Sequence, residues 1–418
     1  MSSIAVENRT GLRRVFRLIR ARIARLILRV VVRRVPVEIR QPDGTSVAPA
    51  NATDLPVIEL VKPDDFFIRL AEHPKIGIGE GYMAGEWRTG PNTDLAEALY
   101  PFAANIKTAV PPILNKLRRI VDRPIPGTQR NSLIGSKRNI EAHYDLSNDL
   151  FEAFLDPTMT YSSAIFNSDI AFAEQDLEQA QLRKINSILD LAEVKAGTKV
   201  LEIGTGWGAL AIEAARRGAQ VTTLTLSQEQ ASLAKERVAA AGLSELVDIR
   251  IQDYRKVVGK YDAVVSVEMI EAVGEEFWPT YFAALDNLTA PGGLIAIQAI
   301  IMSHDRYLAT RNSYGWIQKH IFPGGLIPSM EAIFSTTEKH TQVRVDQMFA
   351  FGKHYAETLR RWRANFYQSW PKISGHGFDD LFFRKWEFYL AYCEAGFDSG
   401  YLDVVQLRLS RPTEMEKA

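Results

Sequence analysis

The feature that most restricts the fold is an apolar run that ends in a carboxylate and three alternate glycines, Lys199-Val-Leu-Glu-Ile-Gly-Thr-Gly-Trp-Gly208. The run predicts a buried strand, and the glycines let the backbone turn sharply and approach a ligand closely. A helix predicted from about Ala209 would point free N–H groups at this loop, which suits a nucleotide ligand. Spaced glycines alone also fit an ordinary turn between a strand and a helix.

Strands and helices alternate after this loop. Strands are predicted at 198–204, 219–226, 246–252, 261–268 and 293–301, with helical patterns at 210–217 and 229–241. Alternation of this kind predicts a doubly wound α/β fold, in which helices cover both faces of a parallel sheet. Ligands of such folds bind at the carboxyl ends of the strands.

Polar residues follow two more of these strands. Thr225 and Leu226 end the second strand, Gln230 follows early in the next helix, and Asp253 and Tyr254 come directly after the third strand. We expect Asp253 to accept a hydrogen bond from an adenine amino group and Tyr254 to lie against the ring, while a helix cap is the alternative for Asp253. The second strand has no terminal carboxylate of the kind that dinucleotide enzymes use.

The amino-terminal segment has a different character. Residues 9–34 contain ten arginines and no acidic residue, and apolar side chains recur there at helical spacing. The apolar runs are too short for a transmembrane helix or a signal peptide. The pattern predicts a basic helix at 1–35 that lies on an anionic membrane surface. The alternative is a helix docked on its own protein with a solvated arginine face.

The domain prediction divides the chain into three parts: this helix at 1–35, a small α+β domain at 36–130 and a catalytic domain at 131–418. Strands at 37–40 and 57–60, a helix at 63–73 and turns at 76–82 are predicted within the small domain. Lys plus Arg and Asp plus Glu each total 50, so no net charge attracts nucleic acid. A lone cysteine, Cys393, excludes an internal disulfide, and the histidine spacing predicts no metal site.

Several uncommon motifs resemble the cyclopropane fatty acid synthases, which use S-adenosylmethionine to methylate double bonds in lipid acyl chains. The resemblance extends from about Asn139 to Pro412. It rests on His143-Tyr-Asp-Leu-Ser-Asn148, Met159-Thr-Tyr161-Ser162, the glycine loop, Glu268-Met-Ile-Glu271-Ala-Val-Gly274, Ile321-Phe-Pro-Gly-Gly325 and Tyr389-Leu-Ala-Tyr-Cys393. It implies a class I methyltransferase fold, Rossmann-like with a helical lid, and the additional amino-terminal domain resembles members that act on intact membrane phospholipids.

The resemblance also implies which residues form the site. Those expected to hold S-adenosylmethionine are Tyr161, Ser162, Gly204, Gly206, Thr225, Leu226, Gln230, Asp253 and Tyr254. Members of the family bind bicarbonate beside the alkene, and Glu271, Tyr355 and the backbone of Ile300 match three of its ligands. Two positions depart from the pattern, with Ser163 in place of a cysteine and Gln298 in place of a histidine. His143 lies in the entrance motif.

These departures bear on the product, because methyl transfer to an alkene leaves a carbocation and the base decides which proton leaves. Glutamine cannot accept a proton at neutral pH. We therefore expect a methylene-branched chain, the precursor of a methyl-branched one made by a flavin-dependent reductase, with cyclopropane formation as the alternative. The expected setting is the cytoplasmic face of the membrane, with a homodimer as a further prediction. A natural-product methyltransferase and a catalytically silent lipid-binding protein are the rival interpretations.

Overall fold

The computed structural model describes residues 12–109, 126–132, 135 and 147–411. The chain forms two compact units. The first unit combines 1–125, 312–321 and 370–401, and the second combines 126–311, 322–369 and 402–418. The long helix α16 (Gly352–Gly375) begins in the second unit and ends in the first.

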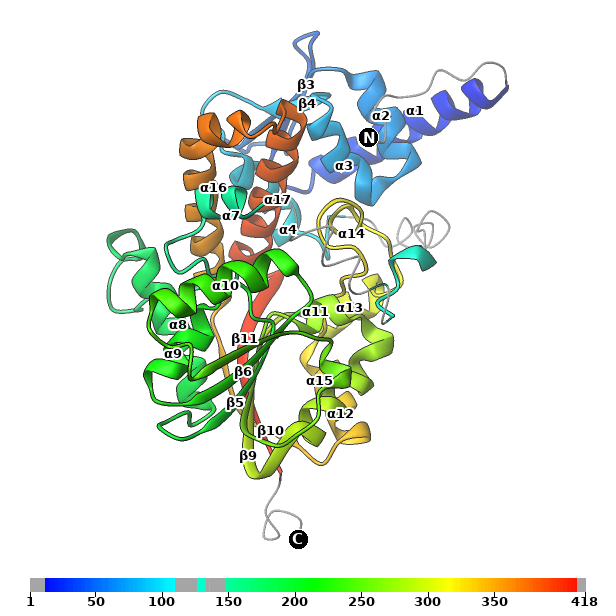
Figure 1. Cartoon of the computed structure of the whole chain (residues 1–418). Coiled ribbons are helices and arrows are strands. Elements are labelled where there is room, and N and C mark those ends of the chain that lie inside the picture. Colours follow the sequence, from blue (N-terminus) through cyan, green and yellow to red (C-terminus); the bar gives the residue numbers. More distant parts are fainter. Residues whose placement is uncertain (1–11, 110–125, 133–134, 136–146, 412–418) are drawn as a thin grey trace. The chain divides into compact units, whose positions relative to one another are not determined.

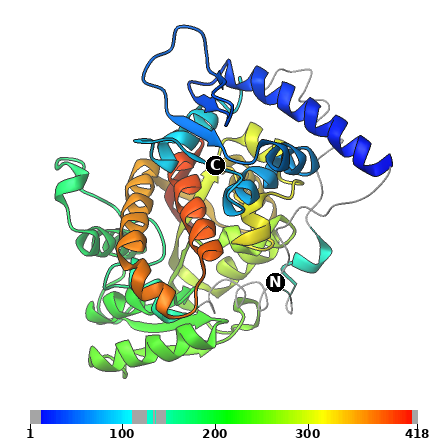
Figure 2. The ribbon, with the colours of Figure 1, turned by 90° about the horizontal axis from the view of Figure 1, so that it is seen from above.

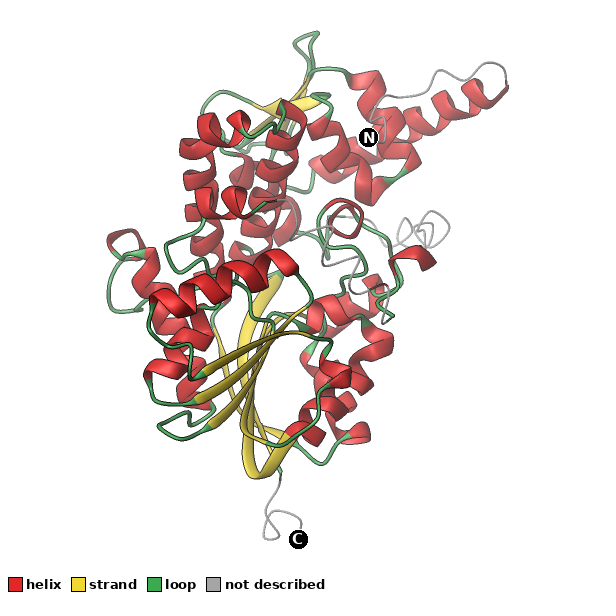
Figure 3. Cartoon of the chain, viewed as in Figure 1, coloured by secondary structure: helices red, strands yellow, loops and turns green. Residues whose placement is uncertain are grey.

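The second unit is built on a seven-stranded sheet (Figures 1 and 3). Its strands are β5 (Lys199–Ile203), β6 (Gln220–Thr225), β7 (Val247–Ile251), β8 (Tyr261–Val267), β9 (Thr289–Met302), β10 (Arg344–Ala350) and β11 (Leu402–Ser410). The strand order is β10-β11-β9-β8-β5-β6-β7. β5 to β9 are parallel, whereas β11 is antiparallel to both β9 and β10. The predicted doubly wound α/β fold is confirmed.

Helices cover both faces of this sheet. On one face lie α8 (Leu177–Leu191), α9 (Ala209–Arg216) and α10 (Gln228–Ala240), and on the other lie α11 (Ile270–Val273), α12 (Trp278–Leu288) and α15 (Met330–His340) (Figure 1). Successive residues of a strand point to opposite faces of the sheet, so Val200 lies in one apolar cluster and Leu201 lies in the other. Such a two-sided core explains why the adjacent residues Val200 and Leu201 of β5 are both apolar.

The remaining elements of the second unit are short. They are η1 (Gly127–Gln129), α7 (Asn148–Phe154), η2 (Phe172–Glu174), η3 (Tyr254–Lys256), η4 (Glu275–Phe277) and α13 (His304–Thr310). The sequence prediction placed β5 to β8 to within one residue at each end. The predicted start of β9 was residue 293, whereas in the structure the strand begins at Thr289. The difference arises because Gly292 and Gly293 resemble a turn in the sequence.

The first unit contains a four-stranded sheet and helices. Its elements are α1 (Leu12–Val32), β1 (Glu38–Arg40), β2 (Ser46–Val47), β3 (Val57–Leu60), α2 (Pro63–Glu72), α3 (Pro74–Met83), β4 (Trp87–Thr89), α4 (Leu95–Ala104), α14 (Trp316–His320) and α17 (Asp380–Asp398). The domain prediction assigned 312–321 and 370–401 to the catalytic domain. In the structure they join the first unit, because Phe388 on α17 packs edge to face against Trp87 and Trp316.

Helix α3 corrects the turns predicted at 76–82. Its glycines indicated turns, but in the structure they lie within a helix and allow neighbouring elements to pack closely against it. A Cβ atom at Gly79 would lie 2.5 Å from the Trp316 indole nitrogen and 2.7 Å from Phe388. Pro74 begins the helix at a position where its missing N–H costs nothing.

Helix α1 confirms the predicted amino-terminal helix (Figure 2). Its polar and apolar faces are used in an unexpected way. Arg17 pairs with Glu72 at 2.6 Å, Arg20 donates to the Ala71 carbonyl oxygen at 2.7 Å, and Arg25 lies over the Phe67 ring. The apolar residues are instead exposed, namely Val15, Phe16, Leu18, Ile19, Ile23, Leu26 and Val30. The helix thus contacts its own unit partly through arginines, the reverse of the docked helix considered above.

Candidate active site

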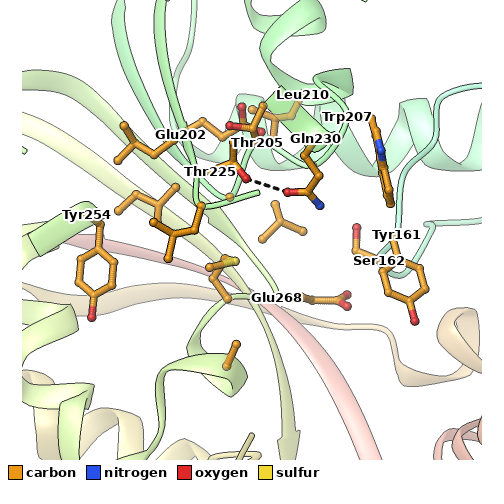
Figure 4. A pocket seen from close by; sticks show the side chains of 18 of the residues that line it. Tyr161, Ser162, Glu202, Thr205, Trp207, Leu210, Thr225, Gln230, Tyr254 and Glu268 are labelled. Carbon is orange, nitrogen blue, oxygen red and sulfur yellow. Dashed lines mark hydrogen bonds between the residues drawn. The ribbon is translucent and has the colours of Figure 1, made fainter. Parts of the chain in front are cut away.

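A pocket lies at the carboxyl ends of β5, β6 and β8 within the second unit (Figure 4). The glycine loop after β5 forms one wall. Gly204 has φ +102° and Gly206 has φ +51°, so both adopt backbone conformations that favour glycine. A Cβ atom at Gly204 would lie 2.8 Å from the Met269 side chain, whereas nothing lies within 4 Å of a Cβ at Gly206. The loop is therefore packed on one side and open on the other.

The end of β6 forms the next wall. The Thr225 hydroxyl donates to the Gln230 side-chain oxygen at 2.8 Å, and the Ser227 side chain caps α10 (Figure 4). This bond orients the Gln230 amide at the pocket. Leu226 completes this wall. A polar amide beside an apolar side chain suits a ribose lying next to an adenine ring.

Asp253 and Tyr254 also line the pocket. The Asp253 carboxylate caps η3 and pairs with Arg255 at 2.6 Å, so the capping role considered for it is present. Contact with a ligand stays a prediction. Tyr254 packs edge to face on Tyr281, and burial raises the pKa of Tyr254 to about 12, which keeps its hydroxyl neutral.

Tyr161 and Ser162 close the opposite side. The Tyr161 ring stacks on Trp362 with centroids 5.2 Å apart, and Ser162 accepts a hydrogen bond from the Lys184 ammonium at 2.5 Å. Lys184 is 1% exposed, and burial lowers its pKa to about 8. The nearby acidic side chains, of which Glu268 has the largest effect, raise the pKa of Lys184 and so oppose part of the effect of burial.

Glu202, at the end of β5, is a buried carboxylate that lines the pocket. One of its oxygens has no hydrogen-bond partner among the described residues, and burial raises its pKa to about 8. A buried carboxylate without a full set of donors favours a cationic ligand. S-adenosylmethionine supplies positive charge through its sulfonium and its amino group.

Two predicted bicarbonate ligands, Tyr355 and the Ile300 backbone, and the two departing positions, Ser163 and Gln298, all donate to glutamate side chains. Glu268 accepts from the Ser163 backbone N–H at 2.9 Å, the Gln298 side chain at 2.8 Å and the Tyr355 hydroxyl at 2.6 Å. The Ile300 N–H donates to Glu271. Binding of bicarbonate itself stays a prediction.

Glu271 differs sharply from Glu268. Its second oxygen is enclosed and has no hydrogen-bond partner within the described part of the chain. Burial and the nearby Glu268 raise the pKa of Glu271 to about 8. Two close carboxylates share protons unequally, and the group with fewer donors keeps its proton.

Comparison with known proteins identifies the family. The family model described as mycolic acid cyclopropane synthetase matches residues 131–407. The chain belongs to this family.

Two curated relatives cover most of the chain. The tuberculostearic acid methyltransferase UfaA1 of Mycobacterium tuberculosis is 50% identical over 94% of this chain and 91% of its own length. The cyclopropane-fatty-acyl-phospholipid synthase of Escherichia coli K12 is 33% identical over 85% of this chain and 88% of its own. The resemblance drawn from the motifs is thus confirmed.

Solved structures agree with the fold. A complex of the mycolic acid cyclopropane synthase CmaA1 with SAH and CTAB is 28% identical, with a TM-score of 0.59, and covers 65% of this chain and 97% of that one. A coclaurine N-methyltransferase structure at 16% identity and a TM-score of 0.56 shares the fold. This member of the mycolic acid cyclopropane synthetase family is therefore a methyltransferase of class I fold, with S-adenosylmethionine as its methyl donor.

The structure brings most of the predicted residues into one region. All nine residues predicted for the donor line the pocket. Ser163, Gln298, Tyr355 and Glu271 surround or adjoin Glu268, which is part of the pocket wall. His143 lies outside the described residues. No group of three or more potential metal ligands occurs among the residues the structure describes.

Sequence reasoning missed Lys184, Glu202 and Glu268 as site residues. Lys184 had a signal, because it falls on the apolar face of α8 together with Ile185 and Ile188. Glu202 stood at the end of a buried strand, directly before the glycine loop. Glu268 lies in the motif Glu268-Met-Ile-Glu271-Ala-Val-Gly274, in which only Glu271 was assigned a role from the resemblance.

Proposed function

We propose that this enzyme transfers the methyl group of S-adenosylmethionine to the cis double bond of an unsaturated phospholipid acyl chain and releases a methylene-branched chain. One observation carries this proposal. The wall of the donor pocket contains the carboxyl group of Glu268 among aromatic and apolar side chains such as Trp207 and Met269, and Glu271 lies close to Glu268. Such a wall keeps water from the carbocation, and a carboxylate can take the proton that the cation must lose.

The relatives support this direction. UfaA1 is named for tuberculostearic acid, and it is the relative with 50% identity. Cyclopropane formation is the second candidate, because the Escherichia coli synthase is 33% identical over most of its length. A flavin-dependent reductase would then convert the methylene group to a methyl group in a separate step.

We further propose that the enzyme meets its substrate at an anionic membrane surface through α1. No helix in the described part of the chain is long and apolar enough to cross a bilayer. The exposed side chains of Phe16, Ile19, Ile23 and Leu26 follow one another at steps of three and four residues. Exposed Arg22 and Arg29 flank them, so apolar burial and attraction to lipid phosphates act together.

The test is to incubate the purified enzyme with S-adenosylmethionine and vesicles of oleoyl phospholipid, and to examine the acyl chains by mass spectrometry and proton NMR. We expect a mass gain of one CH2 unit and exocyclic vinyl protons. Upfield cyclopropyl protons would replace the methylene product with the cyclopropane alternative. Absence of any mass gain, with the protein folded and binding SAH, would overturn both.

A further inference from the structure

The side chain of Glu268 accepts hydrogen bonds from three neutral donors. The donors come from three separate parts of the second unit: Ser163 before α8, Gln298 on β9 and Tyr355 on α16. Both carboxylate oxygens are engaged, one by two N–H donors and the other by the tyrosine hydroxyl. Hydrogen bonds of this kind favour the ionised form of a carboxyl group.

The backbone at Glu268 offers a second, independent observation. Its φ is +51°, a left-handed conformation that favours glycine. A β-substituted residue is strained there, and strained residues of this kind concentrate at functional sites. The strained backbone holds the carboxylate at the pocket wall, next to the Met269 side chain that contacts the glycine loop.

The two neighbouring glutamates divide their roles. Burial raises the pKa of Glu268, but its three donors and the charge of Lys184 oppose this shift. Glu271 has only the Ile300 N–H at one oxygen, and its pKa rises to about 8. The larger number of hydrogen-bond donors therefore favours the negative charge on Glu268 and the proton on Glu271.

We propose that Glu268 is the catalytic base, and that its carboxylate takes the place at Ser163, Gln298 and Tyr355 that a bound bicarbonate ion would otherwise occupy. This inference rests on the function proposed above and names the group that accepts the proton. It shifts the expected base from an added ion held by Glu271 to a side chain of the enzyme itself.

The step balances without any further reactant. The alkene electron pair forms a bond to the methyl carbon as the bond from that carbon to sulfur breaks, which leaves neutral SAH and a carbocation. A hydride shift moves the positive charge to the carbon that bears the new methyl group. Glu268 then takes a proton from that methyl group, and the C–H electron pair becomes the exocyclic double bond. The protonated Glu268 returns its proton to solvent after product release.

The test compares wild type, Glu268→Gln and Glu268→Gly in the vesicle assay, in buffer stripped of carbon dioxide and in buffer with added bicarbonate. Glutamine keeps the shape but cannot accept a proton, so we expect turnover to fall about 100-fold or more. Glycine suits the positive φ and leaves a space among the three donors. We expect Glu268→Gly to be inactive in stripped buffer and to recover activity with bicarbonate, whereas wild type is insensitive to bicarbonate.

Thermal unfolding and SAH binding establish that each variant is folded with its donor site intact. Loss of wild-type turnover on removal of bicarbonate would overturn the inference, and so would Glu268→Gln turnover within a few-fold of wild type. In both of those cases wild type still adds a CH2 unit under some condition, so the proposed function survives. A wild-type enzyme that adds no CH2 unit under any condition would overturn the proposed function and this inference together.

Discussion

The donor pocket and helix α1 depart from ordinary side-chain placement in opposite directions. The pocket encloses ionisable groups, among them Lys184 and Glu202, whereas α1 exposes Phe16 and Leu26 to solvent. Each arrangement costs free energy in the isolated protein. Each becomes favourable when a particular ligand arrives, a cation in the pocket and a lipid surface at α1. Positions that break the usual rules of burial are therefore informative about ligands in both regions.

The largest expected effect is on the pH dependence of protein stability, which the buried Glu202 in the pocket should control. Burial raises the pKa of Glu202 to about 8, so between roughly pH 4.5 and pH 8 the folded protein holds a proton that the unfolded chain releases. The free energy of unfolding should therefore fall as pH rises through this window, by on the order of 5 kcal/mol for this group.

The measurement is denaturant unfolding of wild type and Glu202→Gln at pH 5 and pH 8.5. The amide cannot ionise, so the variant should match wild type at pH 5 and exceed it at pH 8.5. If the difference in stability between wild type and Glu202→Gln were the same at pH 5 and pH 8.5, Glu202 would be solvated in the folded protein. The cationic donor should also raise the unfolding temperature of wild type more at pH 8.5 than neutral SAH does.

The next effect concerns α1. Ile23 is 50% exposed and Leu26 is 61% exposed, so the double variant Ile23→Ser/Leu26→Ser removes apolar surface without disturbing a core. We expect binding to anionic phospholipid vesicles to weaken about 100-fold, equivalent to about 3 kcal/mol of lost burial in the bilayer interface. Vesicle co-sedimentation gives the partition coefficient, and thermal unfolding should not change.

Val258→Ser provides the matched control for this experiment. Val258 is 83% exposed on the second unit, so its loss removes a solvent-facing apolar side chain that is not on α1. Vesicle binding by this control should equal that of wild type. A lowered unfolding temperature in the α1 double variant would mean that this face supports the protein fold, which would break the comparison with the pocket.

A large part of the fold could be predicted from the sequence, but fewer of the contacts within the active site. The clustering of apolar residues located β5 to β8, because a two-sided core requires apolar side chains on both faces of buried strands. Spacing could not reveal that Ser163, Gln298 and Tyr355 share Glu268, since these residues lie far apart along the chain. Pairwise contacts across a fold leave no periodic signal in one dimension.

Helical faces show the same limit in the first unit. The pattern at residues 9–34 predicted an amphipathic helix, but it did not reveal which face would meet the protein. That choice depends on acidic residues elsewhere, such as Glu72 opposite Arg17. In α3 the glycines resembled turns, and only the neighbouring Trp316 shows why a helix needs them there.

The smallest effect tests whether the buried lysine acts through the carboxylates. Lys184→Met removes the positive charge that lowers the pKa of Glu268, so less of Glu268 is ionised at neutral pH. We expect turnover to fall about tenfold, with the pH–rate profile displaced to higher pH. Stability should stay within about 1 kcal/mol of wild type or rise, because a buried ammonium is itself costly.

Lys385→Met is the control, since Lys385 is also a lysine whose pKa burial lowers, but it belongs to the first unit and lies over the Phe382 ring. Its turnover and pH–rate profile should follow wild type. A tenfold loss in Lys184→Met without a displaced profile would mean that Lys184 acts by orienting Ser162 through their hydrogen bond. A displaced profile instead ties Lys184 to the ionisation of Glu268. The buried charged groups of the pocket would then take part in catalysis, which explains why the fold retains them despite their cost in stability.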